Sequence, residues 1–170
     1  MFNNLEKNIN RIAGGDKSGL KSIYNDFKHA VYSLAYTILG DKYLAEDVSH
    51  NVFLKILSSA SSYKTGTSPK AWIMQITRNT AIDELRKKRD ITTDFETNND
   101  NALIYKENYD KKIIVFTAVN TLEFEQRQIV VMHVIAGLTF REIGELLNQP
   151  IGTVAWKYRT SINKLKVILK

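Results

Sequence analysis

The sequence predicts an all-α protein of two small helical domains, joined by a flexible acidic linker, with a helix-turn-helix in the C-terminal domain. Only two prolines interrupt the 170 residues, and apolar residues recur at steps of three and four, which places them on one face of a helix. Charge also changes along the chain: residues 1–89 hold 14 basic and 8 acidic side chains, residues 90–112 hold 3 and 6, and residues 113–170 hold 7 and 4. The middle segment is polar and poor in aliphatic residues, so we interpret it as a linker between two domains.

The N-terminal domain is predicted to begin with a long amphipathic helix that Gly40 ends. Its apolar face consists of Leu20, Ile23, Tyr24, Phe27, Val31, Leu34, Ala35 and Ile38. A second helix is expected over about residues 44–58, and a polar loop follows it to Ser68. On the outer face of this helix lie Asp47, His50, Asn51 and Leu54. Ser68 is expected to cap a third helix, which Pro69 opens and which runs to about Arg89.

The third helix carries a polar stripe that contains one aromatic residue. The stripe consists of Trp72, Gln75, Asn79, Asp83 and Arg86. An aromatic ring and amides can stack on unpaired bases and hydrogen-bond to them, while the basic run 86–89 attracts the phosphate backbone. The pattern fits equally well a helix with Trp72 in the core and a solvated basic end that favours the helix dipole. Both interpretations stay open on the pattern alone.

The C-terminal domain contains the predicted helix-turn-helix. A helix over about residues 125–136 ends at Gly137, and Thr139 with Glu142 forms a capping box for a short helix. The turn 148–150 leads to a last helix, and Gly144 is small enough to allow a close crossing. The buried seam of that last helix is Ile151, Val154, Tyr158, Ile162, Leu165 and Leu169.

A buried seam leaves the opposite side of the last helix for reading DNA. That side carries Thr153, Trp156, Thr160 and Asn163, with Lys157 and Arg159 on its flanks. Hydroxyl, amide and basic groups can donate hydrogen bonds to phosphates and base edges. The alternative is a solvated helix side with Trp156 packed against a neighbour. The capping box, glycine, turn and exposed row together favour DNA reading.

Several classes of site are excluded by the residue types present. The chain has no cysteine, which rules out disulfides, thiolate zinc sites and cysteine nucleophiles and favours a reducing cytosol. The three histidines stand apart from other metal ligands, and neither a phosphate-binding glycine loop nor a nucleophile elbow is present. No stretch approaches the roughly 18 apolar residues of a membrane span. We therefore expect a cytoplasmic protein without catalytic residues, metal, cofactor or small-molecule substrate.

Four stretches, in this order, resemble the extracytoplasmic function (ECF) group of bacterial sigma factors: residues 44–57, 68–89, 125–132 and 137–154. The resemblance implies that residues 1–89 form a domain that binds core polymerase and recognises and melts the minus-ten element. It implies that residues 113–170 read the minus-thirty-five element, and that the linker 90–112 threads polymerase channels. The loop at about residues 58–67 would capture a base flipped from the non-template strand.

The resemblance and the patterns together assign the candidate site residues. Polymerase binding falls to Asp47, His50, Asn51 and Leu54. Contacts to the minus-ten element and melting fall to Lys70, Trp72, Gln75, Arg78, Asn79, Asp83, Arg86, Lys87 and Arg89. Contacts to the minus-thirty-five element fall to Thr139, Arg141, Thr153, Trp156, Lys157, Arg159 and Thr160. The implied partners are core RNA polymerase, promoter DNA and an anti-sigma factor, of a kind that is often membrane-anchored.

Two departures from the family pattern bear on function. Residues 50 and 51 are His-Asn where many relatives have Gln-Glu, which removes a carboxylate from the docking helix. Ala155, Trp156 and Thr160 replace the usual small and basic residues of the recognition helix, which predicts more apolar and shape-based reading. A stand-alone helix-turn-helix regulator explains residues 137–170 equally well but gives residues 68–112 no role. A helical adaptor that binds only protein is the third alternative.

Overall fold

The computed structural model describes residues 2–92 and 117–169, and within these ranges the chain is helical and contains no strand. The all-α prediction is confirmed. Residues 93–116, which include most of the predicted linker, lie outside the described residues. The elements are α1 (Phe2–Ala13), α2 (Gly19–Leu39), α3 (Lys42–Ser59), the 3₁₀ turn η1 (Ala60–Ser62), α4 (Pro69–Thr92), α6 (Phe124–Val134), α7 (Phe140–Leu147) and α8 (Ile151–Ile168).

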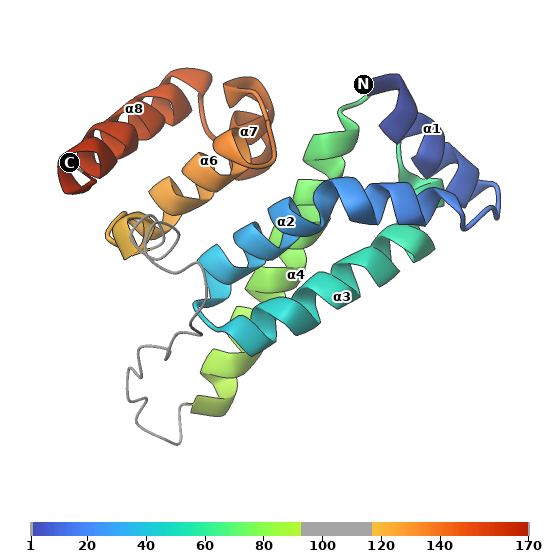
Figure 1. The fold of residues 1–170 in the computed structure, drawn as a ribbon, viewed down its shortest axis with the longest axis horizontal. Coiled ribbons are helices and arrows are strands. Elements are labelled where there is room, and N and C mark those ends of the chain that lie inside the picture. Colours follow the sequence, from blue (N-terminus) through green and yellow to red (C-terminus); the bar gives the residue numbers. More distant parts are fainter. Residues whose placement is uncertain (1, 93–116, 170) are drawn as a thin grey trace.

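The N-terminal unit is a bundle of α1 to α4, in which α2 packs against both α3 and α4 (Figure 1). Gly40 has a left-handed backbone (φ 66°) and ends α2 as predicted, because a glycine reaches this conformation without a Cβ clash. The Asp41 side chain accepts hydrogen bonds from the backbone N–H groups of Tyr43 and Leu44. This cap starts α3 two residues before the predicted position.

Helix α1 was not predicted from the sequence. Leu5, Ile9 and Ile12 are buried and recur at steps of four and three, which is the spacing of a short amphipathic helix. The start of α4 agrees with the prediction, since the Ser68 hydroxyl accepts a hydrogen bond from the backbone N–H of Ala71 at 3.3 Å. The helix continues to Thr92, three residues beyond its predicted end.

The C-terminal unit contains the helix-turn-helix as α7 and α8. Asn148 ends α7 with a left-handed backbone (φ 55°), which asparagine tolerates better than most residues. A Cβ atom on Gly144 would lie 2.6 Å from the backbone oxygen of Gln149. The glycine therefore makes room for the turn itself, directly before α8 begins.

The two units pack against each other (Figure 1). Helix α6 lies along α2, and α7 contacts α4. Ile129, Met132 and Leu138 belong to the same buried cluster as the core of the N-terminal unit. The sequence predicted two domains but not how they are placed relative to each other.

Candidate nucleic-acid interface

Helix α8 exposes its predicted reading side. Trp156 is 59% exposed and Arg159 is exposed, whereas Val154 and Leu165 on the opposite side are buried. Thr153 and Thr160 are half-buried beside this exposed side, and Asn163 is exposed on it. The structure thus places Trp156 toward solvent rather than in the core.

Three aromatic rings hold α8 in this rotation. His133 of α6 stacks on Phe140 of α7 with ring centroids 4.5 Å apart and meets Tyr158 of α8 edge-on at 4.7 Å. Phe140 and Tyr158 are also in contact, at 5.2 Å. Nδ1 of His133 lies 2.7 Å from the Leu138 carbonyl oxygen, which accepts its hydrogen bond. The cluster therefore ties α8 to both α6 and α7.

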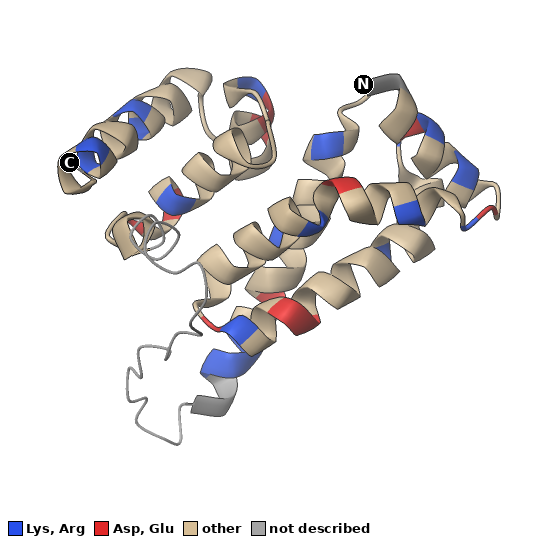
Figure 2. Cartoon of the chain, in the orientation of Figure 1, with Lys and Arg blue, Asp and Glu red and all other residues tan. Residues whose placement is uncertain are grey.

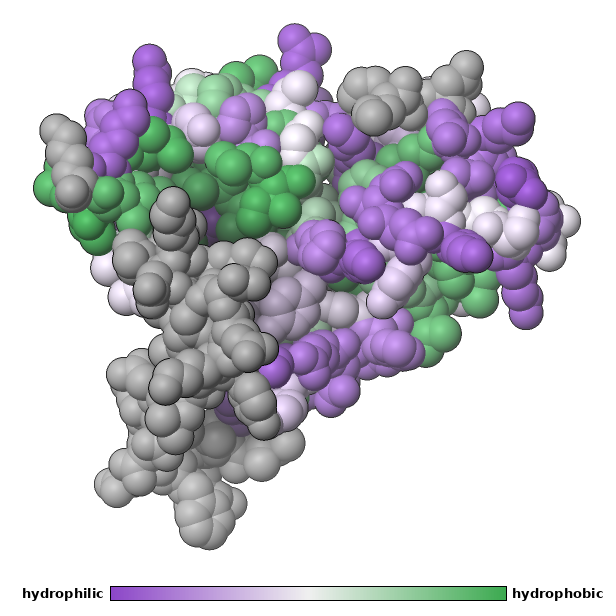
Figure 3. Space-filling view, viewed as in Figure 1, coloured by the Kyte–Doolittle hydropathy of each residue, from purple (hydrophilic) through white to green (hydrophobic). Residues whose placement is uncertain are grey.

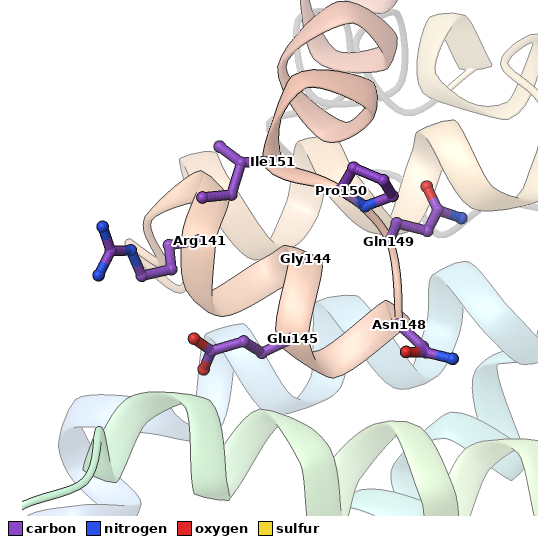
Figure 4. A pocket seen from close by; sticks show the side chains of 7 residues that line it. All are labelled: Arg141, Gly144, Glu145, Asn148, Gln149, Pro150 and Ile151. Atoms are coloured by element: carbon purple, nitrogen blue, oxygen red, sulfur yellow. The ribbon is translucent and has the colours of Figure 1, made fainter.

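A shallow hollow lies on the outer surface of the helix-turn-helix (Figure 4). In the close-up, Arg141 and Ile151 border one side of it, and Asn148 and Gln149 border the other. Arg141 is exposed, so its guanidinium is accessible at the start of α7. Thr139 lies two residues before Arg141. Its backbone N–H and its hydroxyl both donate hydrogen bonds to the Glu142 carboxylate, at 2.6 and 2.8 Å.

Lys157 lies differently from its expected place on the flank of the reading side. Its side chain is only 21% exposed and forms an ion pair with Glu125 at the start of α6. Its ammonium also donates to Oε1 of Gln149 at 3.1 Å, and Gln149 in turn donates to Glu125. Lys157 is thus bound within its own unit, and Arg159 is the basic residue that α8 presents to solvent beside Trp156.

On α4, most of the predicted nucleic-acid contacts are accessible. Gln75, Asn79, Asp83, Arg86, Lys87 and Arg89 are all exposed. Figure 2 shows basic residues on the last turns of α4 and along α8. Trp72 is half-buried, and its ring meets Tyr63 edge-on at 5.4 Å. Trp72 therefore combines features of both interpretations, because part of the ring packs inward and part remains open.

Two predicted contacts on α4 face the C-terminal unit instead. Nε of Arg78 donates to Oε1 of Gln128 at 3.0 Å, and Gln128 on α6 is 1% exposed. Burial lowers the pKa of the Arg78 guanidinium, while the charge of Glu125 acts in the opposite sense. Lys70 lies against the end of α6, since a Cβ on Gly137 would be 3.3 Å from its Nζ.

The Glu142 carboxylate of α7 also lies against the start of α4. Burial alone would raise the pKa of Glu142, but hydrogen bonds from Ser68 and from the backbone and hydroxyl of Thr139 lower it, with help from the charge of Lys70. The net effect holds the pKa of Glu142 below its ordinary value. The Thr139 contacts are the predicted capping box, whereas the contacts of Ser68 and Lys70 with Glu142 were not predicted because these residues are far from Glu142 in the chain.

The predicted polymerase-binding residues share the outer face of α3. Asp47, His50 and Asn51 are exposed, and Leu54 is 57% exposed. A shallow surface hollow between α3 and α4 is lined by Asn51 and Leu54 on one side and by Asp83, Arg86 and Lys87 on the other. The expected docking face thus adjoins the basic end of α4, an adjacency that spacing within each helix does not reveal.

Among residues 2–92 and 117–169, no group of three or more histidine or acidic residues is placed to hold a metal ion. No described helix is both long enough and apolar enough to cross a membrane.

Hydrophobic side chains gather on the C-terminal unit in the view of Figure 3, whereas the N-terminal unit is mostly hydrophilic there.

Comparison with known proteins identifies both units. The family model Sigma-70 region 2 matches residues 23–91, and the model Sigma-70, region 4 matches residues 113–158, together 115 of the 170 residues. The ECF RNA polymerase sigma factor SigW of Bacillus subtilis is 28% identical over 165 residues, which cover 88% of each chain. SigX of the same organism is 24% identical over 139 residues, covering 74% of this chain and 70% of SigX.

Solved structures share the fold over nearly the whole chain. The sigma factor RpoE of Bartonella quintana, solved in complex with the anti-sigma factor NepR, superimposes with a TM-score of 0.76 at 21% identity, covering 88% of this chain and 95% of RpoE. CnrH, solved with the cytosolic domain of CnrY, gives a TM-score of 0.72 at 16% identity over 98% of this chain and 97% of CnrH. Because region 2 matches the N-terminal unit and region 4 matches the C-terminal unit, the chain belongs to the sigma-70 family of sigma factors, in its ECF group.

Proposed function

We propose that the chain binds core RNA polymerase and directs promoter-specific initiation of transcription, without chemistry of its own. The observation that supports the proposal is that one chain carries two separate exposed helix faces with polar, aromatic or basic side chains, each within a sigma-70 match: α8 with Trp156, and the exposed side of α4. A stand-alone regulator needs only the first of these faces. The proposed sigma factor acts in the cytoplasm, where RNA polymerase transcribes DNA.

The C-terminal unit, residues 113–170, reads the minus-thirty-five element in this proposal. Trp156 and Arg159 on α8 and Arg141 on α7 supply the exposed contacts. A large aromatic and one exposed arginine on α8 favour apolar and shape-based recognition over paired guanine contacts. Thr139, Thr153 and Thr160 lie at the edges of this face, and Lys157 joins it when Glu125 releases it.

The N-terminal unit, residues 1–89, recognises and melts the minus-ten element. The exposed amides of Gln75 and Asn79 and the open part of the Trp72 ring suit unpaired bases. Arg86, Lys87 and Arg89 suit the phosphate backbone. The loop after η1 is positioned next to Trp72 through Tyr63, which supports its proposed role in capturing a flipped base.

The outer face of α3 docks on core polymerase, and the segment 90–112 links the two units. Leu54 provides an exposed apolar contact, and Asp47 provides the carboxylate that the His50-Asn51 pair lacks. An anti-sigma factor is a further proposed partner, because the structurally similar sigma factor RpoE was solved in complex with one.

Co-elution of the purified chain with bacterial core polymerase tests the proposal, followed by initiation on a library of promoter fragments. We expect a stable complex and transcripts from a subset of fragments. Leu54→Ser should weaken the complex, whereas Lys21→Ser on the exposed side of α2 should not. Failure of the wild-type chain to bind core polymerase, with DNA binding retained, would favour the stand-alone regulator.

A further inference from the structure

The loop between η1 and α4 contains a turn that closes on itself. The backbone N–H of Thr67 donates to the Lys64 carbonyl oxygen at 3.1 Å, and the Thr67 hydroxyl donates to the same oxygen at 2.7 Å. Gly66 has a positive φ of 87°, as the third residue of a type II turn requires. Residues 64–67 are exposed, so the turn presents Lys64 and Thr65 to solvent.

Glu6 of α1 binds this turn across a sequence separation of 60 residues. Its Oε1 atom accepts a hydrogen bond from the backbone N–H of Gly66 at 2.7 Å, and a charged acceptor makes such a bond stronger than a neutral one does. The Tyr63 hydroxyl lies 3.3 Å from the same oxygen and donates at 2.7 Å to the Thr67 carbonyl oxygen. The Glu6 carboxylate therefore holds the turn and lies beside the residue at which the loop begins.

Glu6 is itself held in place, because α1 packs into the core of the N-terminal unit. Leu5 and Ile9, on either side of it in the helix, are buried. A Cβ atom on Gly19 would lie 2.6 Å from the backbone oxygen of Asn8, so α1 and the start of α2 are in direct backbone contact. The half-buried Glu6 side chain thus reaches the turn from a helix that the core fixes.

The loop also touches the aromatic residue of the proposed minus-ten face. Tyr63 is 8% exposed, and its ring meets the half-buried Trp72 edge-on at 5.4 Å. We propose that Glu6 is a positioning residue for base capture, because it holds the turn 64–67 in a base-receiving shape beside Trp72 before DNA binds. A loop that is already ordered loses little conformational freedom on binding, so the captured base is held more tightly. This inference rests on the proposed function, which assigns base capture to the loop.

The test compares Glu6→Ala and Glu6→Gln in the full chain bound to core polymerase, with Asp26→Ala as the control. Asp26 is an exposed carboxylate on α2, so its loss removes the same charge from the same unit. The probe is a promoter duplex selected from the fragment library and unpaired over its minus-ten element by mismatches. An abasic site then replaces the non-template base at one position after another, and the affinity for each duplex is measured. Hydrogen exchange of the Gly66 amide is followed by nuclear magnetic resonance in the free chain.

We expect Glu6→Ala to bind the intact promoter roughly three- to tenfold more weakly than the wild type and to exchange the Gly66 amide faster. At the captured position, an abasic site should abolish the difference between Glu6→Ala and the wild type, because the base that the loop holds is gone. Glu6→Gln should restore most of the affinity, since its amide oxygen can still accept the Gly66 N–H. Asp26→Ala should match the wild type on every duplex.

An equal loss of affinity in Glu6→Ala on every duplex, the abasic ones included, would show a role in stability alone and overturn the inference. A wild type insensitive to every abasic site would show that base capture itself, and with it the inference, fails. A sensitive wild type whose affinities Glu6→Ala reproduces would overturn the role of Glu6 and leave base capture intact. If Glu6→Ala fails to fold, Tyr63→Phe takes its place in the same comparison, because it removes only the hydroxyl between Glu6 and the Thr67 carbonyl oxygen.

Discussion

Thr139 and Glu142 cap each other at the start of α7. The Glu142 backbone N–H donates to the Thr139 hydroxyl oxygen at 3.2 Å, while the Glu142 carboxylate accepts from the Thr139 backbone N–H at 2.6 Å. Because α7 has only eight residues, these bonds satisfy a large share of its unpaired terminal groups. The cap therefore fixes where the helix-turn-helix begins.

Replacing Thr139 by alanine removes the hydroxyl half of this cap. We expect Thr139→Ala to lower the free energy of unfolding by about 1 kcal/mol, the usual effect of losing a threonine N-cap. Urea denaturation followed by circular dichroism measures it. Thr65→Ala in the exposed loop is the control and should change stability little; equal effects of the two substitutions would contradict a capping role.

Glu142 predicts a pH dependence of stability. Its pKa in the folded chain is lower than its ordinary value, because hydrogen bonds from Ser68 and Thr139 outweigh the effect of burial. The ionised form therefore stabilises the fold above the unfolded-state pKa of about 4.3, and this contribution is lost as pH falls through the lower folded-state pKa. The free energy of unfolding, measured from neutral pH downward, should fall less steeply in Glu142→Gln. Glutamine can still cap the helix but does not titrate. Parallel curves of unfolding free energy against pH for the wild type and Glu142→Gln would show that Glu142 does not cause the pH dependence.

Gly144 and Gly152 form a matched pair of helical glycines with opposite expectations. A Cβ at Gly144 would clash with the Gln149 oxygen, whereas nothing lies within 4 Å of a Cβ at Gly152. Gly144→Ala should destabilise the chain by about 1–3 kcal/mol, as overpacking does. Gly152→Ala should stabilise it by up to about 1 kcal/mol through helix propensity. Denaturant titration of both variants compares them, and stabilisation by Gly144→Ala would show that the turn can shift freely.

Trp156 is expected to act in recognition and not in folding. Because the Trp156 ring is exposed, Trp156→Ala should leave the melting temperature unchanged. It should alter the preferred DNA sequence, measured by selection from a randomised minus-thirty-five library. Tyr158→Ala is the control, since this ring packs on His133 and Phe140 and its loss should lower the melting temperature. A strong requirement for two guanines in the wild-type selection would contradict apolar and shape-based reading.

Arg159→Ala and Lys157→Ala should differ in their effects on DNA binding and on stability. Arg159 is exposed, so Arg159→Ala should reduce the slope of log affinity against log salt by about 0.9 if it contacts one phosphate. Lys157→Ala also leaves Glu125 without its cation, so we expect it to lower stability as well. DNA titrations at several salt concentrations, paired with thermal melts, separate these effects. An unchanged slope for Arg159→Ala would remove that residue from the interface.

The local signals in the sequence predicted most helix boundaries. Gly40, Ser68 with Pro69, and the capping box at Thr139 act over a few residues, and each lies where it was expected. Helix α1 was not predicted, although Leu5, Ile9 and Ile12 recur in the sequence at steps of four and three. Its stability comes from packing on α2, which a pattern within the helix does not encode.

Contacts between distant residues account for what the sequence did not reveal about the site. The position of Lys157 within α8 permits an exposed flank, but Glu125, which pairs with it, lies 32 residues earlier. Arg78 and Gln128 are separated by 50 residues and by the segment 93–116. The Arg78–Gln128 pair depends on how the two units meet, and the Lys157–Glu125 pair depends on how α8 packs on α6. Helical periodicity carries no information about either.

The division of α8 into two sides has a consequence for engineering and for divergence between paralogues. Val154, Tyr158 and Leu165 anchor the helix, while Trp156 and Arg159 take no part in the core. Exchanging the outward residues should therefore leave the yield of folded protein intact while redirecting the factor to other genes. In the proposed function, a few substitutions on the exposed side of α8 would change which promoters the chain reads and leave its folded core as it is.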